Sequence, residues 1–134
     1  MVRITEETSL LRMISRGKRL AITDSEGREK LTAVFEMFEN GTFRDIFESF
    51  GEDLSKLSFT DEEQGAFCKK YAEELEPYGW ANIFLVKRRD KFVIVIVYKE
   101  SGIIQKNESE FESTVYLRGN RHLRVIVPQQ EKDF

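Results

Sequence analysis

The chain has 134 residues, the length of one ordinary domain, and 40 % of them are hydrophobic, which is enough to form a packed core. The net charge of −3 argues against nucleic-acid binding through overall charge. Cys68 is the only cysteine, which excludes an intrachain disulfide. Because no secretory signal is evident either, we expect a cytoplasmic protein without membrane contact.

The first 79 residues have the apolar spacing that is typical of helices. We expect a first helix over residues 5–16 and a second helix that is capped within residues 23–25 and ends at Asn40. Residues 19–23 alternate weakly and predict a short strand or an extended link. The apolar face of the second helix consists of Leu31, Val34, Phe35 and Phe38.

Two further helices begin at recognisable caps. Thr42 and Asp45 form a capping pair for a third helix. Thr60 and Glu63 form a capping box for a fourth helix, which we expect to reach about Glu76. The apolar stripes are Phe43, Ile46, Phe47 and Phe50 in the third helix, Leu54 and Leu57 after a break at Gly51, and Phe67, Tyr71 and Leu75 in the fourth helix.

From residue 80 the apolar period changes to two, which is typical of strands. Residues 92–98 are apolar without interruption, so both faces of this strand need to be covered. Arg89-Asp90, Ser101-Gly102 and Gly119-Asn120 are the expected turns. The predicted strands are residues 82–88 and 91–99, an extension at 103–105, and a second hairpin of residues 111–117 and 121–127.

These elements predict one α+β domain over residues 1–134. About four helices in residues 1–79 pack on an antiparallel sheet of about four strands, or two hairpins, in residues 80–128. Residues 129–134 form a frayed tail. The first helix or a second copy of the chain covers the remaining face of the sheet, and a two-fold homodimer is the expected solution.

Catalytic and metal motifs are missing from the sequence. The single histidine and the single cysteine have no spaced partners, so we expect no metal site. No phosphate-binding glycine motif occurs, so no cofactor is predicted. Cys68 beside Phe67 is expected to be a buried thiol. The sequence therefore favours a protein that is not an enzyme.

Basic side chains flank the two predicted hairpin turns and are the candidate binding residues. If both turns lie at one edge of the sheet, these cations form one patch, with Tyr116 and His122 available to stack on bases. The same cations could instead dock a protein, or simply keep the turns soluble. The candidates are Lys87, Arg88, Arg89, Lys91, Arg118, Arg121 and Arg124.

The favoured hypothesis is a regulatory or adaptor protein that binds another macromolecule, and a protein is the favoured class of partner. Residues 25–79 carry fourteen acidic and six basic side chains and offer a surface for a basic partner. One alternative is a nucleic-acid-binding or metal-independent RNA-cleaving protein that uses the basic turns. A weaker alternative is a small-molecule sensor with a pocket between helices and sheet.

Overall fold

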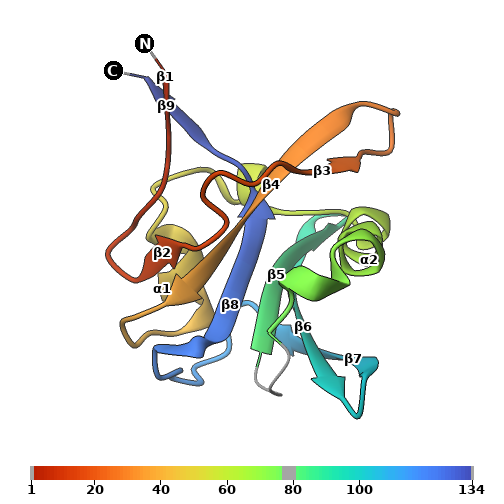
Figure 1. Cartoon of the computed structure of the whole chain (residues 1–134). Coiled ribbons are helices and arrows are strands. Elements are labelled where there is room, and N and C mark those ends of the chain that lie inside the picture. Colours follow the sequence, from red (N-terminus) through yellow and green to blue (C-terminus); the bar gives the residue numbers. More distant parts are fainter. Residues whose placement is uncertain (1, 77–80, 134) are drawn as a thin grey trace.

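A seven-stranded mixed sheet forms the centre of the molecule (Figure 1). The computed structural model describes residues 2–76 and 81–133. The sheet consists of β2 (Leu11–Met13), β3 (Leu20–Thr23), β4 (Glu29–Met37), β5 (Ala81–Arg88), β6 (Lys91–Glu100), β7 (Ile103–Glu110) and β8 (Asn120–Pro128). The strand order is β2-β4-β8-β5-β6-β7. The strand β3 pairs with the same edge of β4 as β2 does, but nearer the start of β4. All neighbours are antiparallel except β5 and β8, which are parallel.

The described residues contain only two α-helices, so the predicted class of four helices on a four-stranded antiparallel sheet is wrong. The division into helical residues 1–79 and a later sheet is also wrong, since β2, β3 and β4 precede residue 40. The helical elements are α1 (Phe43–Glu48) and α2 (Asp61–Lys70), with short 3-10 helices η1 (Leu54–Leu57) and η2 (Ala72–Glu74).

The second predicted helix is instead β4, a central strand between β3 and β8. Phe35 packs on one face of the sheet and Val34 on the other, and both are buried. A strand that is buried on both faces has a continuous apolar run, which also satisfies helical spacing. The predicted cap at residues 23–25 belongs to the β3–β4 turn, where Asp24 accepts backbone hydrogen bonds from Glu26 and Arg28.

The first predicted helix, residues 5–16, is also wrong. Its apolar residues divide between the two faces of the sheet, with Leu11 in one core cluster and Ile14 against the other. Thr8 Oγ1 accepts hydrogen bonds from the N–H groups of Leu10 and Leu11, which makes a turn before β2. Residues 20–23 form β3, which confirms the short-strand alternative.

Both predicted capping signals are confirmed. Thr42 and Asp45 cap α1, and Thr60 and Glu63 cap α2 through reciprocal hydrogen bonds. The α-helix ends at Lys70, before the predicted Glu76, and the chain continues into η2. The residues that were expected to end the helix, Pro77-Tyr78-Gly79, lie outside the described residues.

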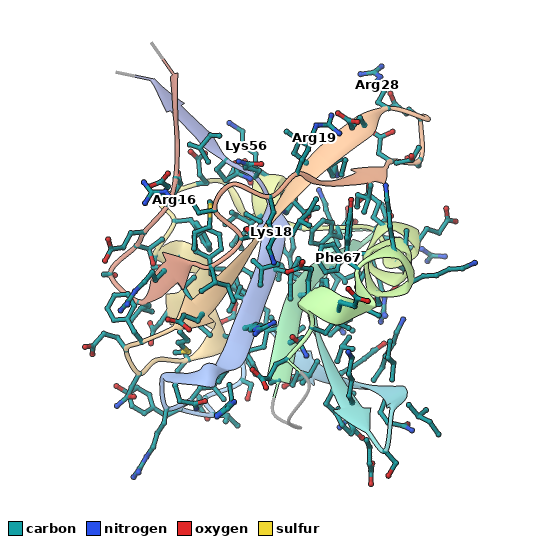
Figure 2. The ribbon with its side chains drawn as sticks, viewed as in Figure 1. Arg16, Lys18, Arg19, Arg28, Lys56 and Phe67 are labelled. Atoms are coloured by element: carbon teal, nitrogen blue, oxygen red, sulfur yellow. The ribbon has the colours of Figure 1, made fainter. Side chains whose placement is uncertain are left out.

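The two helices cover opposite faces of the sheet (Figure 1). Phe47 of α1 belongs to one apolar cluster, whereas Phe67 of α2 belongs to the other and points toward the sheet, 5.7 Å from the Phe84 ring (Figure 2). The chain changes faces between Leu57 and Phe59, and Phe59 forms a parallel bridge to Val86 at the end of β5.

The apolar run 92–98 lies in β6, as predicted, and its two faces are covered within the chain. Ile94 belongs to the cluster under α1, and Val95 and Val97 belong to the cluster under α2. This covering removes the reason for expecting a partner copy on either face.

The C-terminal part differs from the prediction in two places. The β5–β6 hairpin and the Ser101-Gly102 turn are confirmed, but residues 111–117 form no strand and β8 pairs with β4 and β5 instead of a hairpin partner. The predicted frayed tail contains β9 (Glu131–Asp133), which pairs with β1 (Val2–Ile4). Gly119 lies so close to the segment that follows β4 that an added Cβ would be 2.6 Å from the Glu39 backbone, so this loop requires glycine.

Candidate functional site

The parallel pairing of β5 and β8 separates the predicted basic residues into two groups. Ala81 pairs with Leu123, so the start of β8 lies beside the start of β5. The β5–β6 turn lies at the other end of β5. Arg118 and Arg124 are therefore distant from Arg89, and the seven candidates do not form one patch. The side chain of Arg121 lies outside the described residues.

Arg88 is already occupied by ion pairs within the chain. Its Nη2 lies 2.8 Å from Asp61 at the start of α2 and 2.6 Å from Glu108 in β7. Its guanidinium lowers the pKa of both carboxyl groups through hydrogen bonds, and these bonds raise the pKa of Arg88. Arg88 therefore joins two elements of the fold instead of facing a partner.

The opposite end of the sheet holds a second polar cluster. Arg124 Nη1 donates a 2.6 Å hydrogen bond to the Glu74 carbonyl, and His122 Nδ1 lies 3.3 Å from the buried Glu76 carboxylate. The Glu76 N–H donates a 2.8 Å hydrogen bond to Asn82 Oδ1. Tyr116 is 65 % exposed in the loop before β8, so both predicted stacking residues lie away from the β5–β6 turn.

A cavity of about 420 Å³ lies at the β5–β6 end of the sheet, where the chain crosses between the two faces. We call it the tip cavity. Three segments build it: the β3–β4 turn, residues 55–63 with the start of α2, and the β5–β6 turn. Its charged lining residues are Asp24, Glu26, Arg28, Lys30, Glu63, Lys87 and Arg89, and Ser25, Ser55, Ser58 and Thr60 add hydroxyl groups.

The carboxylates of the tip cavity are all engaged within its wall. Asp24 accepts two backbone hydrogen bonds of 2.9 Å in the β3–β4 turn, and the bond from Arg28 is the main cause of its lowered pKa. Glu26 lies 2.8 Å from Arg28. Glu63, which is 3 % exposed, accepts from the Thr60 N–H and from Lys30 Nζ.

Lys87 and Arg89 differ from these residues, because neither forms an ion pair with a carboxylate among the described residues. Lys87 Nζ lies 3.3 Å from Ser55 Oγ. Both side chains are exposed at the mouth of the tip cavity. The Ser58 hydroxyl donates to the Ser55 carbonyl, so the groups that remain available for a ligand are the two cations and exposed hydroxyl groups such as that of Ser25, which suit an anion.

Some other basic side chains on the surface are paired and some are not. Lys69, Lys91 and Arg118 also form no ion pair among the described residues, whereas the five basic side chains labelled in Figure 2 each lie beside a carboxylate. The pairs are Arg16 with Glu6, Lys18 with Glu74, Arg19 with Glu29, Arg28 with Glu26 and Lys56 with Glu52.

The backbone of Arg89 is in the left-handed region, with φ of +56°. A non-glycine residue there costs about 1–2 kcal/mol relative to the right-handed region. Such strain is often retained at functional sites. At this turn it places an arginine at the mouth of the tip cavity.

Lys91, the fourth candidate of this turn, lines a different cavity. It lies with Arg88, Val93 and Glu108 beside a space of about 310 Å³ on β6 and β7. Of the predicted cations whose side chains the structure describes, two, Lys87 and Arg89, therefore share the tip cavity. Sequence reasoning missed Arg28 and Lys30, because their segment was expected to be helical.

Other chemistry has little support in the described part of the chain. No group of three or more His, Cys, Asp and Glu side chains there could hold a metal ion. Burial raises the pKa of the Cys68 thiol to about 11, which opposes a nucleophilic role. No helix in residues 2–76 and 81–133 is long and apolar enough to cross a membrane.

Comparison of the chain with protein-family models, with curated proteins and with solved structures gave no match.

Proposed function

We propose that the protein is a non-enzymatic regulatory or adaptor protein that binds a partner protein through the tip cavity. In this proposal, Lys87 and Arg89 receive an anionic side chain of the partner, either a carboxylate or a phosphate. The observation that carries it is the difference in pairing: the carboxylates of this cavity are engaged, whereas these two cations have no carboxylate partner among the described residues, and Lys87 contacts only the Ser55 hydroxyl and the Phe92 ring. Arginine and lysine bind such anions through charge-assisted hydrogen bonds.

The composition of the cavity wall favours a protein partner over a nucleic acid. Asp24, Glu26 and Glu63 would repel a chain of phosphates, whereas one isolated anion can lie between Lys87 and Arg89. Among the described residues, Phe59 is the one aromatic residue that lines the cavity, and it is 1 % exposed and offers no surface for base stacking.

Selection from a random displayed peptide library tests the proposal, with the Lys87→Glu/Arg89→Glu variant used for counter-selection. We expect enriched peptides to contain Asp or Glu and to bind the variant at least about tenfold more weakly. Lys69→Glu/Arg118→Glu is the matched control: both cations are exposed, lie away from the tip cavity, and give the same change in net charge. It should change affinity by less than about twofold.

Labelled single-stranded RNA and a phosphoserine peptide form the parallel arms of the same measurement. Peptides that bind the tip variant as well as the wild type would contradict the proposal. Tight RNA binding that is lost in the tip variant would also contradict it and would establish a nucleic-acid partner. Preference for the phosphoserine peptide would identify phosphate as the anion.

A further inference from the structure

The two edges of the sheet differ in how their backbone groups are covered. At the β2–β3 edge, residues 6–8 form backbone hydrogen bonds to β2. The Ala21 carbonyl of β3 accepts from Lys70 Nζ and the Tyr71 hydroxyl, both at 2.8 Å. This edge is therefore closed by other parts of the chain.

The β7 edge is open. β7 pairs with β6 along all eight residues without a bulge, and it packs extensively only against that strand. Apart from this ladder, no hydrogen bond of the described residues reaches the backbone of residues 103–109. Antiparallel pairing uses the N–H and C=O groups of alternate residues, so the other residues of β7 direct theirs outward. Figure 1 shows β7 at the outer margin of the sheet.

Sheet edges are commonly protected by proline, by bulges or by charge. β7 contains no proline and no bulge, and its protection against pairing depends on charged side chains. Lys106 and Glu108 are two residues apart, so they lie on the same face of the strand. Within the chain, Lys106 Nζ donates a 3.0 Å hydrogen bond to Gln64 Oε1 and Glu108 pairs with Arg88 at 2.6 Å, but both side chains are exposed. When two copies of β7 pair antiparallel, the lysine of one copy can lie opposite the glutamate of the other, so the order of Lys106 and Glu108 along the strand is self-complementary.

We propose that β7 pairs antiparallel with β7 of a second copy of this chain, about a two-fold axis at Asn107. In this register, Lys106 lies opposite Glu108 of the partner subunit, and the same contact occurs twice. Gln105 then lies opposite Ser109 of the partner subunit, which allows a hydrogen bond between the side chains.

The charges select this register against its neighbours. An axis at Lys106 places two ammonium groups opposite each other, and an axis at Glu108 places two carboxylates opposite each other. An unrelated strand would lack this reciprocal match, so a second copy is the partner that the edge fits. The edge is separate from the residues that line the tip cavity, and the two proposals can fail independently.

Sedimentation equilibrium of the full chain, from micromolar to submillimolar concentration, tests the dimer. We expect a reversible dimer in the wild type. Lys106→Glu and Glu108→Lys each create two like-charge contacts, so each should weaken the dimer by about tenfold. Glu108→Lys also removes the ion pair with Arg88, so urea unfolding of each variant accompanies the measurement. The double variant Lys106→Glu/Glu108→Lys restores opposite charges and should recover the dimer to within about threefold.

Because Glu108 also pairs with Arg88, a variant outside this ion pair is needed to separate dimerisation from folding. Asn107→Lys is a further exposed substitution and places two ammonium groups on the axis, so it should also weaken the dimer. Glu62→Lys and Lys69→Glu, on the exposed side of α2, are matched controls that should leave it unchanged. A monomeric wild type overturns the proposal. So does a dimer that is insensitive to the single reversals and to Asn107→Lys, or one that a folded double variant fails to recover.

Discussion

Lys30 Nζ lies 3.1 Å from each carboxylate oxygen of Glu63, which joins β4 to the first turn of α2 beneath the tip cavity. The same carboxylate accepts the Thr60 N–H and so completes the helix cap. One buried side chain therefore holds together two of the three segments that build the cavity.

Glu63→Ala should destabilise the protein by about 1–3 kcal/mol, because it removes a helix cap and the partner of Lys30. Urea unfolding at neutral pH measures this loss. Glu62→Ala, at an exposed position of the same turn, should change the free energy of unfolding by less than about 0.5 kcal/mol. Equal effects of the two substitutions would show that the buried contact is unimportant.

Arg89→Gly should separate stability from binding. Glycine adopts the left-handed region without steric cost, so the free energy of unfolding should stay constant or rise by up to about 1 kcal/mol. Binding of the selected acidic peptides should fall, because the guanidinium is lost. Ser101→Gly is the control, since Ser101 also has positive φ but lies in a different turn. It should leave peptide binding unchanged, and a large loss of stability in Arg89→Gly would refute the assigned strain.

Arg88→Gln should lower the free energy of unfolding at neutral pH. It should also make the decrease of this free energy in acid less steep than in the wild type. Arg88 lowers the folded-state pKa of Asp61 and of Glu108 below their ordinary values of 3.8 and 4.5. The unfolded chain therefore binds more protons as the pH falls through this range. The ion pairs stabilise the fold above about pH 4.5 and lose their contribution below it. Urea midpoints of both proteins from neutral pH to about pH 3 should converge in acid; parallel curves would disprove this role.

Cys68 should be protected from thiol reagents in the folded protein. Its raised pKa of about 11 implies about a hundredfold less thiolate at neutral pH than an ordinary cysteine has. Its 5 % exposure limits access further. Modification by a disulfide reagent, followed by absorbance, should be slow in buffer and fast in concentrated urea. Rapid modification of the folded chain would show that the thiol is accessible.

The features that were predicted correctly depend on neighbours in the sequence. The Thr42–Asp45 and Thr60–Glu63 caps and the turn at Arg89-Asp90 each act within a few residues, so a single sequence contains their signal. The apolar run 92–98 likewise predicted a strand with two covered faces.

The features that were missed depend on contacts distant in the sequence. β4 is a strand because β3 and β8 pair with both of its edges, and its double burial imitates a helical face. The place of β8 beside β5 follows from a parallel pairing across the sheet, and it moves Arg118 and Arg124 away from Arg89. Lys87 and Arg89 were identified as binding candidates, but the β3–β4 turn that completes their cavity was not.

Amide chemical-shift mapping of the isotope-labelled protein, titrated with a selected acidic peptide, tests the central proposal most directly. We predict shifts concentrated in the β3–β4 turn, in residues 55–63 and around Lys87 and Arg89, with no change around Tyr116 and His122 at the opposite end of the sheet. Shifts confined to that opposite end, or the same shifts in Lys87→Glu/Arg89→Glu, would contradict binding at the tip cavity.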